Sequence, residues 1–109
     1  MWTISGEISF PTSLATIKNS AFYGVGVEKI ILNSPVHLDY GAFNNCKTKE
    51  IVIPKGSTFD KCVFMNCNNL ETVYYGGTRS EWNSLIKSYG YTNEDYQFIH
   101  SLNVVCSDD

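Results

Sequence analysis

The sequence predicts a short right-handed α/β solenoid of about four rungs, with a parallel sheet on one face and a helical cap at the C-terminal end. The main observation is a small residue followed by phenylalanine, which recurs at a fixed interval of 21 residues. The three copies are Ala21–Phe22, Ala42–Phe43 and Val63–Phe64. A period of this size is typical of chains in which each repeat buries its apolar face only by stacking on its neighbours.

Two further sets of apolar residues follow the same period. Ile17, Leu38 and Phe59 each stand four residues before the small residue, and we expect them on an irregular or tight helical segment. Each phenylalanine is followed by a set that ends on two residues separated by one, which is typical of a strand with one buried face. These sets are Val27, Ile30 and Leu32; Thr48, Ile51 and Ile53; and Leu70, Val73 and Tyr75. Strands of successive rungs are expected to pair in parallel, about 4.8 Å apart.

Corners and turns are marked by proline, glycine and asparagine. Pro11 and Pro54 come directly after two expected strands, and Pro35 comes three residues after another, where the chain needs no further ladder donor. The turn after each phenylalanine contains residues that tolerate a left-handed backbone. They are Gly24, Asn44, Asn45 and Asn66.

The period ends in the C-terminal third, as expected for a cap that covers an open stack. Thr78–Glu81 has the pattern of a capping box. We expect a helix of about ten residues after it, with Trp82, Leu85 and Ile86 on one face and its end near Gly90. That face would cover the last rung.

We expect a single domain over residues 1–109. Its expected parts are an N-terminal cap with the first strand at 1–10, the repeats at 11–75, and the helical cap with the last strand at 76–109. Trp2 and Ile4 alternate and are expected to close the first rung. The segment 93–100 is ambiguous, with a second helical turn as one option, and 102–106 is expected to form the final strand.

Several stretches carry a resemblance to a known family. Ala42–Cys46 with Ile51–Pro54, and Phe64–Leu70, resemble the BspA-like leucine-rich repeats, whose rungs read approximately A-F-x-x-C-x-x-L-x-x-I-x-I-P. Val73–Trp82 and Val104–Asp108 are similar to that family's closing repeat. The resemblance covers nearly the whole chain.

This sequence departs from the family pattern in individual rungs. Val25 replaces the cysteine of the first rung, Thr48 stands about where leucine is usual, and no proline adjoins the strand after Phe22. The resemblance implies a protein of bacterial or protist surfaces, or one associated with phages, that binds host proteins or matrix. Members are usually long, secreted and anchored.

Charge and hydropathy exclude two classes of partner. The formal net charge of −3 leaves no basic footprint for phosphate backbones, so a nucleic-acid partner is not expected. Nowhere do 18 apolar residues occur in succession, and the first residues resemble no secretion signal, so no membrane partner is expected. As written, the chain is expected in the cytoplasm, or at the cell surface or secreted if it is a fragment of a longer protein.

Four cysteines raise the question of metals and disulfides. They stand at 46, 62, 67 and 106 and lack the paired C-x-x-C spacing of a zinc site. Cys46 and Cys67 occupy one place on successive rungs, where the preceding rung has Val25. Because valine and free cysteine both fill small buried positions, we expect buried thiols, with a disulfide between adjacent rungs as the alternative.

No catalytic constellation is found. Gly76–Ser80 has no P-loop lysine, and His37 and His100 are isolated in the sequence, so each is expected at the surface or rim. Asp39 and Asp60 share a column, and their carboxylates would lie about 5 Å apart at strand spacing. A weak cation site and a solvated turn both fit that spacing, and we favour the solvated turn. No enzyme, cofactor or metal is therefore predicted.

The outward face of the strands is the candidate site. One column is apolar, Ile31, Val52 and Tyr74; the next is Lys29, Glu50 and Thr72; the third is Glu28, Lys49 and Glu71. Charges alternate in sign along both flanking columns, so neighbouring rungs attract each other. An apolar column with a charged rim is typical of a protein-binding patch. The alternative is that exposed β-branched residues only satisfy strand propensity.

The function predicted is a non-enzymatic protein-interaction module. The predicted contact residues are Ile31, Val52, Tyr74, Lys29, Glu50, Glu28, Lys49 and Glu71. Its partner is a protein of unknown identity, and self-association is a further use of the same patch. One alternative is a small intracellular inhibitor from a phage or mobile element that blocks a host defence enzyme such as a CRISPR nuclease. Another is the terminal fragment of a secreted adhesin.

Overall fold

The computed structural model describes residues 7–9, 16–19, 21–87, 89 and 93–109. The expected roles of Trp2, Ile4 and Pro11 lie outside these residues. The strands are β1 (Glu7–Ser9), β2 (Thr16–Ile17), β3 (Lys29–Ile31), β4 (His37–Leu38), β5 (Glu50–Ile53), β6 (Thr58–Phe59), β7 (Thr72–Tyr75) and β8 (Asn103–Val105). The helices are α1 (Arg79–Leu85) and α2 (Asn93–Ser101).

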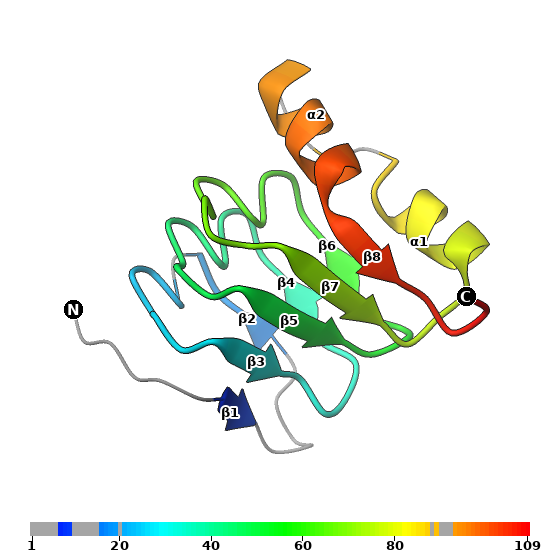
Figure 1. Cartoon of the computed structure of the whole chain (residues 1–109), viewed down its shortest axis with the longest axis horizontal. Coiled ribbons are helices and arrows are strands. Elements are labelled where there is room, and N and C mark those ends of the chain that lie inside the picture. The colour runs from blue at the N-terminus through cyan, green and yellow to red at the C-terminus, as the bar shows by residue number, and fades with distance from the viewer. Residues whose placement is uncertain (1–6, 10–15, 20, 88, 90–92) are drawn as a thin grey trace.

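Two parallel sheets alternate along the chain (Figure 1). The larger has the order β1-β3-β5-β7-β8 and the smaller has the order β2-β4-β6, so each repeat adds one strand to each sheet. In the larger sheet Ile30 pairs with Ile51, and Ile51 pairs with Val73. The expected parallel pairing of successive repeats is therefore confirmed.

The core lies between the two sheets because each strand turns alternate residues inward. Ile30, Ile51 and Val73 are at most 1% exposed, whereas the residues between them on the outer face are half-buried. Ile17 and Leu38 enter the same core from the smaller sheet. The two-residue period read from the sequence thus selects the buried face correctly.

The segment that carries Ile17, Leu38 and Phe59 differs from the expectation. It was expected to be irregular or tightly helical, and this is wrong, because these residues end the two-residue strands of the smaller sheet. The N–H of Thr58 donates to the carbonyl of Val36 at 3.0 Å. Copies stacked at a constant interval satisfy each other's backbone groups, so an extended segment needs no local helical bonds.

A column of aromatic rings runs through the repeats. The rings of Phe22 and Phe43 stack with centroids 4.9 Å apart, and those of Phe43 and Phe64 stack at 5.6 Å. Tyr89 continues the column at 6.4 Å from Phe64, although it lies outside the periodic part of the sequence. The cap therefore supplies the ring that a further repeat would have supplied.

The turns need a left-handed backbone at fixed places in the repeat. Gly24, Asn45 and Asn66, each 21 residues apart, have φ of 73°, 58° and 59°. Gly41 and Cys62, also 21 apart, have φ of 64° and 57°. Glycine adopts this region freely and asparagine tolerates it, which confirms the turn role expected of the first three residues.

The C-terminal cap begins with the predicted capping box. The hydroxyl of Thr78 accepts from the N–H of Glu81, and the Glu81 side chain accepts from the N–H of Thr78. The hydrogen bond from Thr78 lowers the pKa of the Glu81 carboxyl. The expected length is wrong, because α1 has seven residues and its C-cap is Ile86; the predicted end near Gly90 lies outside the described residues.

The remaining cap elements close the end of the stack. α1 and α2 lie at the end of the larger sheet where β8 is added (Figure 1). The ambiguous segment is α2, whose Ile99 is buried, and the predicted final strand is β8, which pairs in parallel with β7. Within the described part of the chain, neither helix is long and apolar enough to cross a membrane.

The Tyr89 hydroxyl gives a first prediction. It accepts from the backbone N–H of Phe64 at 3.2 Å in a buried setting, and burial raises the pKa of this phenol. Tyr89→Phe should lower the free energy of unfolding by about 1 to 3 kcal/mol, because the buried N–H loses its acceptor. Urea denaturation measures it, with exposed Tyr96→Phe as the matched control; equal stability of both variants would contradict the cap's role.

Candidate functional site

The outward apolar column assembles as the sequence predicts and extends further. Parallel register places Ile31 beside Val52 and Val52 beside Tyr74. Tyr74 in turn pairs with Val105 of β8, which is 37% exposed. We call these four residues the strand face. It crosses four adjacent strands without a polar interruption.

The first flanking column holds the aromatic residue of the strand face in place. Lys29, Glu50 and Thr72 lie side by side in the register. The Tyr74 hydroxyl donates to Glu50 Oε2 at 3.3 Å, and Lys29 Nζ lies 5.1 Å from the centre of the Tyr74 ring. A cation over the ring face and an acceptor at the hydroxyl both favour the observed rotamer. Tyr74 is therefore preorganised and not freely rotating.

The second flanking column is more open. The N–H of Lys49 donates to the carbonyl of Glu28 at 3.1 Å, and the N–H of Glu71 donates to the carbonyl of Lys49 at 2.9 Å. These backbone bonds place the three exposed side chains in adjacent repeats. No ion pair joins them in the described part of the chain, so their charges are available to a partner.

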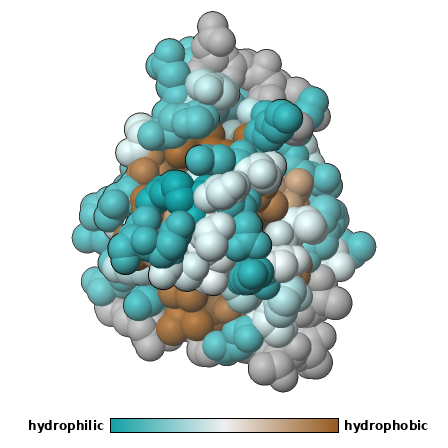
Figure 2. All heavy atoms as spheres, turned by 90° about the vertical axis from the view of Figure 1, so that its right-hand side faces the viewer, coloured by the Kyte–Doolittle hydropathy of each residue, from teal (hydrophilic) through white to brown (hydrophobic). Residues whose placement is uncertain are grey.

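A shallow hollow lies at the carboxyl ends of β5, β7 and β8. Its volume is about 250 Å³. The apolar and aromatic residues lining it include Leu32, Val52, Ile53, Pro54, Tyr74 and Val105. Figure 2 shows this side of the molecule, where small hydrophobic areas are surrounded by hydrophilic surface. The hollow can accept one apolar side chain at the end of the strand face.

Val105 was not among the predicted contact residues. The strand that carries it follows α2 and falls outside the 21-residue period, so no column of the repeats includes it. A signal is nevertheless present, because Leu102 and Val104 alternate with Asn103 and Val105 as in a strand with one buried face.

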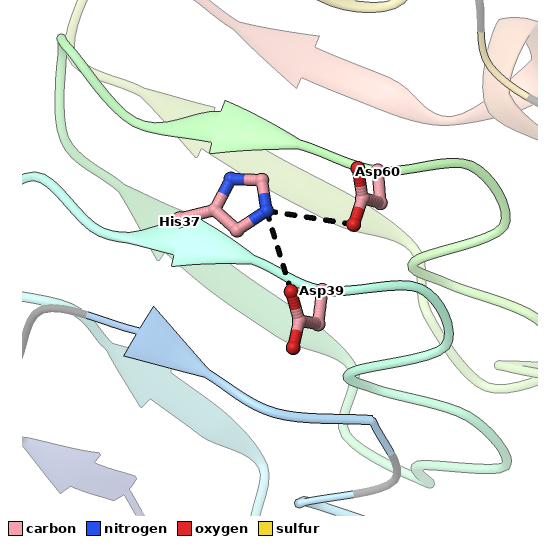
Figure 3. A group of neighbouring side chains, drawn as sticks. All are labelled: His37, Asp39 and Asp60. Carbon is pink, nitrogen blue, oxygen red and sulfur yellow. Dashed lines mark ion pairs between the residues drawn. The ribbon is translucent and has the colours of Figure 1, made fainter.

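A second cluster of polar side chains lies on the smaller sheet. His37 Nε2 is 3.3 Å from Asp39 Oδ1 and 3.4 Å from Asp60 Oδ2 (Figure 3). His37 Nδ1 lies 2.7 Å from the hydroxyl oxygen of Thr58 in the neighbouring strand. The interpretation of His37 as isolated is wrong, because Asp60 comes from the next repeat, 23 residues later in the chain. His100 also has a neighbour, since its ring lies 4.2 Å from that of Tyr96.

The order hydroxyl, imidazole, carboxylate in this cluster invites comparison with a nucleophilic triad. Such a site also needs N–H donors for the developing oxyanion. The N–H of Thr58 donates to Val36 and that of Asp60 donates to Leu38, so both are used by the sheet. The cluster therefore lacks these two donors, and its geometry does not support acyl transfer at Thr58.

The largest hollow lies between the third repeat and α1. It has a volume of about 450 Å³, and Lys55 and Glu81, which line it, form an ion pair of 3.4 Å. Gly77, beneath it, has no room for a side chain, because a Cβ there would lie 2.6 Å from the Tyr75 ring. The lining includes neither histidine nor cysteine. The hollow offers no general base of the usual kind.

The cysteines are core residues, as expected. All four thiols are free and buried. The Cys67 thiol donates to the carbonyl of Phe43 at 2.9 Å, and the Cys46 thiol lies 3.2 Å from the hydroxyl of Thr48. Burial raises the pKa of Cys67 to about 12. This thiol stays protonated at neutral pH and is a poor nucleophile.

These features define an α/β repeat protein with parallel sheets and a helical C-terminal cap. Residues 3–101 match the model of the family described as "BspA type Leucine rich repeat region (6 copies)". The chain belongs to this family, and the resemblance read from the sequence is confirmed. Leucine-rich repeats generally mediate protein–protein interaction and are typically non-enzymatic. No curated protein and no solved structure matches the chain.

Proposed function

We propose that this chain is a non-enzymatic module that binds a protein partner through the strand face. In this proposal the repeats form a short right-handed solenoid of about four turns, which presents its parallel strands to the partner. The supporting observation is the uninterrupted apolar column from Ile31 to Val105 across four strands, with charged columns at its side.

The chemistry of the surface favours a protein over other partners. A central apolar strip with a charged rim matches the usual anatomy of a protein interface. Tyr74 combines a large ring, a hydroxyl and a rotamer held by Lys29 and Glu50, so it loses little conformational entropy on binding. The rim alternates in sign through Glu28, Lys49 and Glu71, which complements a partner with both charges.

The test replaces the centre of the strand face. Ile31→Asp plus Val52→Asp should reduce partner capture at least tenfold, because two adjacent carboxylates would be buried in an apolar contact. The measurement is capture from a lysate of the source organism on immobilised chain, followed by mass spectrometry. Only proteins retained by the unchanged chain and lost by the variant count as partners.

A matched variant controls for added charge. Thr16→Asp plus Gln97→Asp introduces the same two charges at exposed positions away from the strand face and should leave capture unchanged. Ile31→Thr plus Val52→Thr keeps strand propensity, and it tests the surface without placing like charges side by side. Equal capture by the unchanged chain and by folded strand-face variants would rule out this surface.

The identity of the retained protein sorts the more specific roles. A host defence nuclease would identify the chain as an intracellular inhibitor, whereas a host surface or matrix protein would identify it as part of an adhesin. A second copy of the chain is a third outcome. Sedimentation velocity detects it directly, and the same Asp variant should then convert the dimer to monomer.

A further inference from the structure

The cluster on the smaller sheet presents an unusual hydrogen-bonding problem. His37 Nε2 faces one oxygen of Asp39 and one of Asp60, and ionised carboxylate oxygens accept hydrogen bonds but do not donate. A bare ring nitrogen would place three lone pairs against one another. The space between the three atoms must therefore hold a proton on His37 or a cation that all three atoms share.

The second ring nitrogen is placed for the cation. His37 Nδ1 lies 2.7 Å from Thr58 Oγ1, so an N–H at Nδ1 donates to this hydroxyl. That tautomer leaves the lone pair of Nε2 directed at the two carboxylates, as Figure 3 shows. Histidines that bind metals usually donate their other N–H in this way, which fixes the ring and the tautomer.

The distances suit a small transition-metal ion. Ligand atoms bound about 2.0 to 2.1 Å from a tetrahedral Zn²⁺ lie about 3.3 to 3.4 Å apart. The two distances from His37 Nε2 are 3.3 and 3.4 Å. All three ligand atoms lie within 4.8 Å of one another, so the carboxylates need to approach by about 1 Å at most. Rotation of the partly exposed Asp60 side chain supplies such a movement.

We propose that His37, Asp39 and Asp60 bind one divalent cation of the Zn²⁺ type, with water at the remaining position. One imidazole with two carboxylates favours Zn²⁺ or a similar first-row ion over Mg²⁺ and Ca²⁺, which prefer oxygen alone. Because Asp60 follows β6 while His37 and Asp39 belong to the preceding repeat, the ion joins two neighbouring repeats. The first repeat has Thr16 and Lys18 at the corresponding places and cannot form the same site.

The experiment is a ZnCl₂ titration of the isotopically labelled full chain followed by NMR. One ion per chain should shift the His37 ring signals and the amides of residues 37–39 and 58–60. Asp39→Asn plus Asp60→Asn, which preserves side-chain shape, should weaken Zn²⁺ binding at least tenfold. Thr58→Val should weaken it severalfold and Thr58→Ser should restore it, because only the hydroxyl orients the ring.

His100→Ala is the matched control. It removes the other histidine, which is exposed on α2, and should leave the affinity unchanged. No shift at residues 37–39 and 58–60 up to millimolar Zn²⁺ would show that His37 holds only a proton and would overturn the proposal. Retained binding in the double Asn variant, for example at thiols, would overturn it as well.

Discussion

Phe43→Ala is expected to destabilise the chain by about 3 to 5 kcal/mol, the usual cost of removing a fully buried aromatic ring. Phe43 is 0% exposed, and its ring lies between those of Phe22 and Phe64. The substitution removes both stacking contacts and leaves a cavity in the middle of the repeats. Because the column continues to Tyr89, the loss weakens contacts on both sides of the second repeat.

Urea denaturation followed by circular dichroism measures this effect. Tyr23→Ala is the control, because Tyr23 is the next residue in the chain and is 58% exposed. It should cost well under 1 kcal/mol, as surface substitutions usually do. Equal stability of Phe43→Ala and Tyr23→Ala would contradict the stacked-repeat architecture itself.

Trp82→Ala is expected to cost a similar amount, about 3 to 5 kcal/mol. Trp82 is the buried residue of α1, and its ring lies 5.7 Å from that of Phe59 and 5.4 Å from that of Tyr75. Its loss uncovers the last repeat, so apolar surface should become accessible as well. Binding of a hydrophobic dye should therefore increase under native conditions.

The neighbouring position provides the control for the cap. Asn83 is exposed on the same helix, and Asn83→Ala should change neither the free energy of unfolding nor dye binding appreciably. A Trp82→Ala variant that matches Asn83→Ala in both measurements would show that α1 does not close the stack.

The periodic part of the fold was predictable because one physical constraint repeats. A strand that buries Ile30, Ile51 or Val73 needs the same residue types at the same interval, and parallel pairing then sets which residues become neighbours. The order of the apolar column Ile31, Val52 and Tyr74 followed from that rule alone. Its use as a binding surface stays a prediction.

The smaller sheet was missed for a different reason. Each of its strands has two residues, and two residues are too few to show alternation. Tyr89 and Val105 were missed because the cap obeys no period: each joins a column of the repeats from a place that the 21-residue spacing does not reach.

The His37 cluster shows how repeats assemble sites. His37 and Asp39 are two residues apart on one extended segment, and Asp60 occupies the place of Asp39 in the next repeat. The two carboxylates were placed together from the period, but the histidine beside them was considered only against its neighbours in the sequence. In a stack of repeats, each residue has to be considered together with the residues one period away.

Photo-crosslinking from the strand face tests the proposed function most directly. A diazirine-bearing aliphatic residue replaces Val52 in one variant and Thr16, which is exposed on the smaller sheet, in another. After irradiation with the captured protein, we expect a covalent adduct from position 52 and none from position 16. An adduct from position 16 with none from position 52 would show that the partner binds elsewhere.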